Sequence, residues 1–229
     1  MTRALFPALF CGDTAPRESK VLQGLAEPII LRSDTRIFSE HDTADHLFGL
    51  SRGVVRIYKM LPDRRRQVLT FALPGEFLSP PLGRHFLFSA DAIGEVSLCR
   101  FRREALVEFV QSSPTMMRLM IEFVIGELDN AQHQLLLLGN RSAEEKVAIF
   151  LIGWRDRLAR ISPPSDTTPL PMRRQDIADF LGLKLETVSR TLGKLLQKGV
   201  IRLVPKGVVL TGLERMLASP DAAIQRTEM

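Results

Sequence analysis

One stretch, IADFLGLKLETVSRTLGKLLQKGVIRL at residues 177–203, constrains the fold of this 229-residue chain more than any other. Apolar residues recur there at helical spacing in two short segments, residues 174–181 and 185–197. Gly182 lies between the segments and permits the sharp turn that would join two helices. This spacing is typical of a helix-turn-helix, in which the second helix enters the major groove of DNA.

The two predicted helices have distinct inner and outer faces. The apolar residues predicted to face inward are Ile177, Ala178, Leu181, Val188, Leu192 and Leu195. The residues that the first turns of the second helix would expose are Glu186, Thr187, Ser189 and Arg190. An arginine can hold guanine O6 and N7, a glutamate can accept from cytosine N4, and hydroxyls suit bases or phosphates. The outer face therefore has groups suited to reading bases.

A short β-hairpin is predicted after these helices. Gly199 ends the second helix, and the apolar runs 201–204 and 208–210 flank a turn at Pro205-Lys206-Gly207. Two such strands would form a wing beside the helix-turn-helix. The alternative to a DNA-binding helix-turn-helix is a surface helical hairpin with no ligand.

Two segments lead into this region. Residues 142–161 are predicted as a helix that begins with an approximate capping box at Ser142 and Glu145. Residues 161–172 are rich in Pro, Ser and Thr and are predicted as a linker.

The charge of the chain is unevenly distributed. Lys and Arg total 31 and Asp and Glu total 26, which gives a formal net charge of +5. Residues 1–140 are neutral overall, so the whole excess lies in residues 141–229. This asymmetry indicates a polyanionic partner for the C-terminal part. The alternative is a chance asymmetry of a solvated surface.

Other features restrict the compartment and the possible cofactors. No run of residues approaches the roughly 18 apolar residues that a bilayer span requires, and the N-terminus lacks the pattern of a signal peptide. We therefore expect a cytoplasmic protein with no membrane partner. Cys11 and Cys99 are the only cysteines, which excludes a disulfide framework and a four-cysteine metal or cluster site.

Residues 29–101 have the pattern of a β-domain. Short apolar alternations, which predict strands, are interrupted by Ser-Asp, Arg-Gly, Pro-Asp and Pro-Gly turn signals. Many short strands without long helices between them favour a sandwich or jelly roll. Residues 58–67 look like a hairpin tip that displays Arg64, Arg65 and Arg66.

A long helix follows, with Ser113 as its predicted N-cap, Pro114 as its first residue and Gly139-Asn140 as its end and a hinge. Its apolar residues alternate at steps of four and three, which is a heptad seam for a partner helix. The seam consists of Met117, Ile121, Val124, Leu128, Ala131, Leu135 and Leu138. Packing against the chain's own sheet usually needs a wider apolar stripe, so we favour a homodimer.

The stretch RQDIADFLGLKLETVSRTLGKLLQKGVI resembles the DNA-binding signature of the CRP/FNR regulator family. LPDRRRQVLTFALPGEFL, FSADAIGEV and LLGNRSAEEKVAIFLIGW are similar to its FixK-type branch in particular. The resemblance covers residues 25–212 and implies an α+β fold. The implied parts are an N-terminal segment (1–20), a cyclic-nucleotide-binding-like β jelly roll (21–110), a long dimerisation helix (111–139) and a C-terminal winged helix-turn-helix (140–229). The family's base-reading Glu, Ser and Arg correspond to Glu186, Ser189 and Arg190.

The chain departs from the family pattern at informative positions. Nucleotide-binding members have an Arg-Ser or Arg-Thr pair, whereas Phe88 precedes Ser89 here although Gly75-Glu76 is kept. Arg84 is several residues away, so we do not expect cAMP binding. Two cysteines cannot supply the cluster of the oxygen-sensing members. Where the family usually has a small hydroxyl N-cap, the second helix has Lys184, and Arg173 stands at the N-cap of the first.

These observations predict a sequence-specific transcription regulator, acting as an activator, that binds double-stranded DNA as a homodimer with no small-molecule cofactor and works with RNA polymerase. The residues predicted to contact DNA are Arg173, Arg174, Lys184, Leu185, Glu186, Thr187, Ser189, Arg190, Lys194 and Lys206. No phosphate loop, nucleophile motif or metal-ligand spacing favours an enzyme.

A regulator of the same fold gated by haem or another ligand is the alternative. His41, His46, His85 and His133 are its only candidate imidazoles, and none lies in a ligand-type motif. Asp42 and Asp45, beside two of these histidines, are interpreted as part of a solvated turn rather than a metal site.

The resemblance also implies a DNA site. FixK- and FNR-type members read palindromes with a TTGA-like half-site, in promoters of low-oxygen or nitrogen-related genes. The nucleotide-activated branch has an additional Arg before its Glu and reads a half-site richer in guanine. Leu185 occupies that position here and can pack only on a thymine methyl. We therefore expect a TTG(A/C)-type half-site, repeated as an inverted palindrome.

Overall fold

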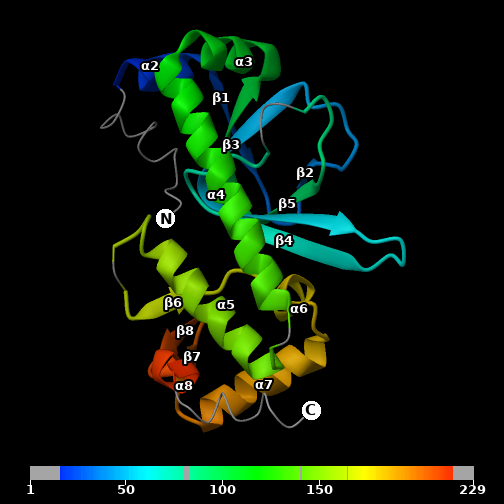
Figure 1. The fold of residues 1–229 in the computed structure, drawn as a ribbon, viewed down its shortest axis with the longest axis vertical. Coiled ribbons are helices and arrows are strands. Elements are labelled where there is room, and N and C mark those ends of the chain that lie inside the picture. The colour runs from blue at the N-terminus through cyan, green and yellow to red at the C-terminus, as the bar shows by residue number, and fades with distance from the viewer. Residues whose placement is uncertain (1–15, 80–82, 140, 164, 219–229) are drawn as a thin grey trace. The chain divides into compact units, whose positions relative to one another are not determined.

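The computed structural model describes residues 16–79, 83–139, 141–163 and 165–218 (Figure 1). The chain divides into two compact units, Met1–Gln132 and His133–Met229, so the division falls inside the long helix α4. Cys11 and Asn140, the second residue of the predicted helix end and hinge, lie outside the described residues. The residue boundaries of the four functional parts that the sequence implied stay predictions.

The N-terminal unit is an antiparallel β-structure flanked by helices. Its strands pair in the order β1-β5-β3-β4, and β2 also pairs with β5. The elements in chain order are α2 (Pro16–Leu25), β1 (Ala26–Leu31), β2 (Arg36–Phe38), β3 (His46–Met60), β4 (Arg66–Ala72), β5 (Ser89–Arg102), α3 (Arg103–Ser112) and α4 (Pro114–Leu138). The hairpin predicted at residues 58–67 is present between β3 and β4.

The turn predicted at Arg52-Gly53 is wrong, because β3 runs through both residues. Pairing between β3 and β5 continues on either side with shifts of register. Gly53 has a φ of 93°, and a Cβ there would lie 2.6 Å from the backbone oxygen of Glu95. The glycine therefore forms a bulge that lets the two strands approach closely, rather than a break between strands.

Two apolar clusters hold this unit together. One fills the space enclosed by the strands and includes Phe38, Phe48 and Phe86. The other joins one end of the sheet to helices, with Leu22 of α2, Leu106 of α3 and the buried side of α4. The helices α2 and α3 were not predicted, since each has only ten residues and a short apolar pattern.

The C-terminal unit contains the predicted helix-turn-helix. Its elements after α4 are α5 (Ala143–Leu158), β6 (Thr167–Pro169), α6 (Arg174–Leu181), α7 (Leu185–Gln197), β7 (Ile201–Val204), β8 (Gly207–Leu210) and α8 (Leu213–Ala218). The bounds of α6 and α7 agree with those predicted. The helix predicted at 142–161 ends earlier, at Leu158, and its capping box between Ser142 and Glu145 is present.

The wing has three strands rather than the two predicted, because part of the expected linker is the strand β6. The strands pair in the order β6-β8-β7, all antiparallel. Trp154 of α5 donates a hydrogen bond from Nε1 to the carbonyl oxygen of Pro169, at 2.8 Å, which fixes the end of β6 to α5. A three-residue strand containing proline has no detectable alternation, so only its partner β8 defines it.

Among the residues that the structure describes, no helix is both long enough and apolar enough to cross a membrane.

Candidate nucleic-acid interface

Gly182 forms the turn between α6 and α7. It is left-handed, with a φ of 63°, and its N–H donates to the carbonyl of Ala178. Glycine adopts this conformation without a steric penalty, so the second helix can begin three residues later. All six residues predicted to face inward are at most 3% exposed, which fixes the rotation of α7 about its axis.

The opposite face of α7 is uncovered. Glu186, Arg190 and Lys194 are exposed, whereas Thr187 and Ser189 are half-buried. Glu186 and Arg190 lie one turn apart and therefore point to the same side of the helix. Leu185, the first residue of the helix, is 37% exposed. The structure thus brings the predicted base-reading groups together on one face.

The two helix starts are capped differently. The Arg173 backbone N–H donates to Oδ2 of Asp176 at 2.9 Å, so the buried Asp176 supplies the reciprocal half of a capping box. The capping role of Asp176 was not predicted, although an acidic side chain three positions after an N-cap is its usual signal. Lys184, as predicted, makes no side-chain cap for α7. The first amides of α7 are therefore not satisfied by their N-cap side chain.

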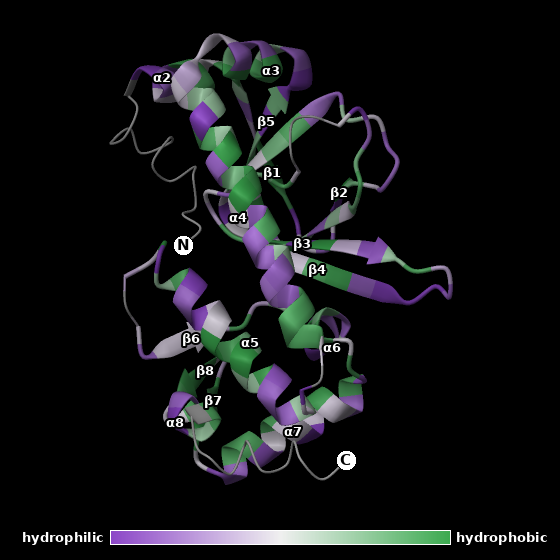
Figure 2. Cartoon of the chain, viewed as in Figure 1, coloured by the Kyte–Doolittle hydropathy of each residue, from purple (hydrophilic) through white to green (hydrophobic). Residues whose placement is uncertain are grey.

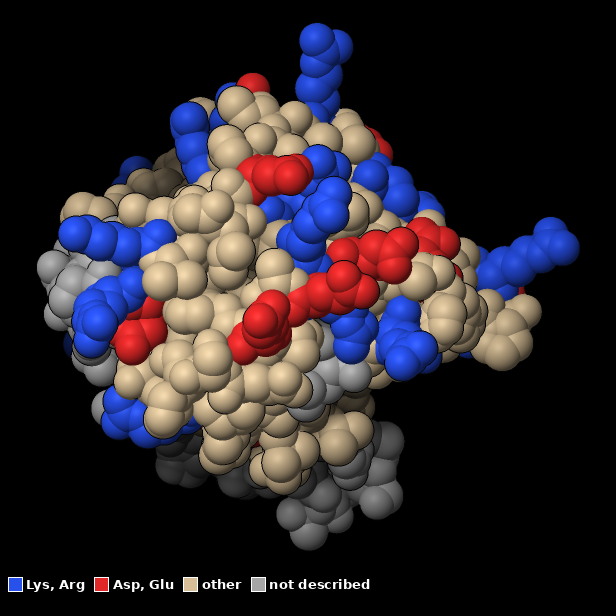
Figure 3. Space-filling model, turned by 90° about the horizontal axis from the view of Figure 1, so that it is seen from above, with Lys and Arg blue, Asp and Glu red and all other residues tan. Residues whose placement is uncertain are grey.

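Basic side chains are exposed at the starts of both helices and on the wing. Arg173, Arg174 and Lys184 are exposed at the two helix starts, and Lys206 is exposed at the wing tip with a φ of 60°. Arg202, which was not predicted, is also exposed on β7. The alternation of the IRLV run could have identified it. By contrast, Lys and Arg are interspersed with Asp and Glu on the face that Figure 3 shows.

The helix α4 has two apolar sides with different surroundings. Met116, Met120 and Phe123 are buried against the N-terminal unit. The predicted seam lies beside them on the same helix, and its residues through Leu135 are exposed, with Leu128 at 60% and Leu135 at 71%. Figure 2 shows apolar and polar residues alternating along α4. From Met117 to Leu135 the seam is therefore not buried by the described residues, whereas Leu138 is half-buried, with its side chain near Gly182.

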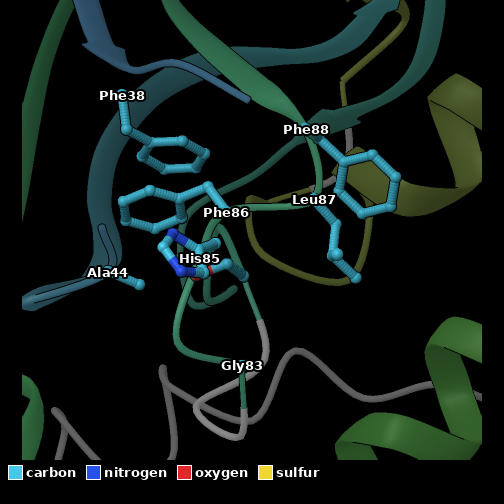
Figure 4. Close-up of a pocket in the computed structure, with 8 residues that line it drawn as sticks. Phe38, Ala44, Gly83, His85, Phe86, Leu87 and Phe88 are labelled. Carbon is cyan, nitrogen blue, oxygen red and sulfur yellow. The ribbon is translucent and has the colours of Figure 1, made fainter. Parts of the chain in front are cut away.

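The interior of the β-structure is filled by aromatic rings. Phe38 and Phe86 are stacked with ring centroids 3.8 Å apart (Figure 4). The ring centroid of Phe48 lies 5.8 Å from that of Phe38. The cavity beside them, lined mainly by apolar side chains, has a volume of about 30 Å³. Pockets that hold small molecules usually have roughly 300–1,000 Å³.

The polar residues that the family uses for nucleotides have local partners here. A carboxylate oxygen of Glu76 accepts from the backbone N–H of Leu73 at 3.0 Å, and Ser89 Oγ accepts from the N–H of Glu40 at the same distance. Phe88 stands at the arginine position, with Lys59 Nζ 5.7 Å from its ring centroid. Among the described residues, no group of three His, Cys, Asp or Glu side chains could hold a metal ion.

A partly buried group of three charged residues links strands of this unit. Asp91 of β5 accepts from Arg36 Nε at 2.5 Å and from Arg56 at 3.0 Å, which joins β5 to β2 and β3. The hydrogen bond to Asp91 raises the pKa of Arg36, and burial raises the pKa of Tyr58, which lies between these arginines. We interpret the group as structural, since Asp91 bridges the two arginines and so links three strands.

A β-roll followed by a long helix and a winged helix-turn-helix with an exposed, basic second helix defines a class of DNA-binding regulators. The family described as "Bacterial regulatory proteins, crp family" matches residues 170–201, and the family described as "Cyclic nucleotide-binding domain" matches residues 28–113. The chain belongs to the CRP/FNR family of transcription regulators, as the sequence predicted.

Known relatives place the chain near FixK proteins. It is 50% identical over 198 residues to the transcriptional activatory protein AadR of Rhodopseudomonas palustris, covering 86% of this chain and 83% of AadR. It is 44% identical over 220 residues to the nitrogen fixation regulation protein FixK of Bradyrhizobium diazoefficiens, covering 91% of this chain and 93% of FixK. The structure of FixK2 from Bradyrhizobium japonicum superposes on this chain with a TM-score of 0.78 at 34% sequence identity, covering 84% of this chain and 96% of FixK2.

These similarities confirm three predictions from the sequence. The chain is FixK-like within its family, and its fold is α+β, with a cyclic-nucleotide-binding-like β-roll and a Crp-type helix-turn-helix. Like its relatives, it is a transcription regulator and not an enzyme.

Proposed function

We propose that this protein is a cytoplasmic transcription activator that binds a TTG(A/C)-type palindrome as a homodimer, recruits RNA polymerase there and needs no small-molecule effector. The observation that carries the proposal is the uncovered face of α7, on which Glu186 and Arg190 lie one turn apart beside Ser189. The named activator and nitrogen fixation regulators among its relatives support the direction of control.

The half-site follows from the first turn of α7. Arg190 can hold a guanine at two atoms, and Glu186 can accept from cytosine N4. Leu185 is exposed but has no hydrogen-bonding group, so it can contact only the methyl group of a thymine. An A·T pair is therefore favoured where an arginine at this position would favour G·C.

The homodimer is supported by the exposed seam of α4. Its apolar residues gain stability only when another apolar surface removes them from water. A second copy of the same helix offers a matching heptad pattern. Two copies would also present two reading helices to a palindrome with half-sites about 34 Å apart.

Activity without an effector is supported by the interior of the β-roll. Among the described residues, its small, mainly apolar cavity and its stacked phenylalanine rings leave little room for a nucleotide. Phe88 replaces the cation that a phosphate would need, and Glu76 and Ser89 already have backbone partners. Haem binding has no comparable support, because none of the four histidines lies in a ligand-type group.

The test is selection of binding sites from random DNA duplexes by the purified protein. We expect an inverted repeat of TTG(A/C), selected equally well with and without cAMP. Leu185→Arg should shift the selected half-site toward an added G·C pair. Selection of a GTGA-type site by the wild type, or a tenfold or greater gain of affinity with cAMP, would contradict the proposal.

A further inference from the structure

Gly193 lies in the third turn of α7 on the same side as the predicted reading residues. It is seven residues after Glu186, which is two helical turns or roughly 10 Å along the axis. At helical spacing, Glu186, Arg190, Gly193 and Gln197 form one stripe. Gly193 is therefore the position without a side chain on a face otherwise lined by polar groups.

Nothing within the described chain requires a glycine there. The residue belongs to an α-helix and is not among the glycines with positive φ, unlike Gly182. A Cβ at Gly193 would meet no atom within 4 Å, whereas one at Gly53 or Gly207 would lie 2.6 or 2.7 Å from a backbone oxygen. Glycine is also a poor helix former compared with every ordinary residue except proline. Neither the backbone conformation nor the packing of the unit explains it.

A close approach by a bound molecule would explain it, since glycine serves where a backbone must come near a ligand. The major groove of B-DNA is about 12 Å wide, and an α-helix with its side chains has a diameter of about 10–12 Å. A helix in this groove has little clearance to either wall. A side chain two turns after Glu186 on the same stripe would reduce that clearance further.

We infer that Gly193 positions α7 in the DNA major groove by letting the helix backbone approach the sugar–phosphate wall of the groove. The inference rests on the proposed DNA-binding function and adds a specific residue to it. Gly193 acts here through the absence of a side chain, so it sets the depth at which Glu186 and Arg190 reach the bases. It is a positioning residue for sequence reading.

The chain contains a control for the effect of helix propensity. Gly153 lies inside α5, is exposed, and a Cβ there would also meet no atom within 4 Å. Alanine at either position should improve helix propensity and raise the melting temperature of the full-length protein by about 2–4 °C. Only Gly193 faces the proposed DNA, so the two variants should differ in DNA binding and not in stability.

The experiment measures melting temperature and affinity for the wild type, Gly153→Ala, Gly193→Ala and Gly193→Gln, using the selected palindrome and a random duplex. We expect Gly193→Ala to bind the palindrome about tenfold more weakly and to lose part of its preference over the random duplex. Gly193→Gln, with a larger side chain and good helix propensity, should bind more weakly still. Gly153→Ala should bind like the wild type.

The outcomes separate this inference from the proposed function. Equal affinity of Gly193→Ala and the wild type for the palindrome would overturn the inference and leave the function intact. A lower melting temperature for Gly193→Ala would assign the glycine to internal packing and would also overturn the inference. A wild type with no sequence preference would overturn both.

Discussion

The outward faces of α4 and α7 are both left uncovered by the chain, but they are chemically opposite. On α4, the exposed positions of the seam are apolar, whereas on α7 the exposed face carries Glu186, Arg190 and Lys194. An apolar face is stabilised by any matching apolar surface, while charged groups lose hydration on contact and must regain hydrogen bonds from the partner. The comparison indicates a protein partner for α4 and a hydrogen-bonding, anionic partner for α7.

The strongest way to break this comparison is to place a charge in the seam. Leu128→Glu would bury a carboxylate between two helices, so we expect monomers and a loss of operator affinity of about 10²–10⁴-fold as the second half-site is released. Sedimentation and DNA titration measure the two effects. Asn130→Glu, at an exposed position in the same helix turn but outside the seam, is the control and should stay dimeric. A dimeric Leu128→Glu would place the interface elsewhere.

A smaller effect is expected when one reading group is removed. Arg190→Ala should cost about 1–3 kcal/mol on the selected site and relax the preference at one guanine, because a bidentate contact is lost. Binding to a random duplex, measured in parallel, should change much less. Unchanged discrimination between the two duplexes would show that α7 is not oriented in the groove as proposed.

A still smaller change is expected at the start of α7. Lys184→Ala should weaken binding to selected and random duplexes alike and reduce the slope of log affinity against log salt by about 1, because one phosphate contact is lost. Lys20→Ala removes one exposed charge from α2 and should leave the slope unchanged. If both variants had the same slope, Lys184 would not contact DNA.

The smallest expected effect concerns the stability of the unit that carries α7. Arg155 of α5 donates to Glu214 of α8, and this hydrogen bond lowers the pKa of Glu214. A carboxylate with a lowered folded-state pKa contributes stability above its unfolded value, about 4.3, and loses it as the pH falls through the folded value. Being surface-exposed, the pair should contribute at most about 1 kcal/mol.

Glu214→Gln tests this contribution by denaturant unfolding at neutral and acidic pH. The variant should be slightly less stable than the wild type at neutral pH, and the difference should shrink below about pH 4. A difference that grew on acidification would contradict the sign of the pKa shift.

Most of the correct predictions from the sequence rested on the regular spacing of apolar residues. The bounds of α6 and α7 and the inward residues were predictable because helical spacing and Gly182 act locally. The seam of α4 was visible for the same reason. Its residues through Leu135 are exposed in the single chain, and the homodimer that the sequence favours to cover them stays a prediction.

The features that were missed depend on contacts distant in sequence. Gly53 looked like a turn because only the approach of β5 identifies it as a bulge. The strand β6 is defined by its pairing with β8 and by the hydrogen bond from Trp154. Both partners lie outside its own three residues, so the local sequence gives no sign of the strand. For the DNA-contact residues, the sequence supplied the candidates, and their role stays a prediction.

The position of Trp154 has a spectroscopic consequence. The chain has one tryptophan and one tyrosine, and they lie in different units, Trp154 in the C-terminal one and Tyr58 in the N-terminal one. Trp154 is 2% exposed, and its indole nitrogen is hydrogen-bonded to Pro169. Selective excitation of tryptophan should therefore report the unfolding of the DNA-reading unit alone, with a red shift of emission as the indole becomes hydrated, in the full-length protein and without an added label.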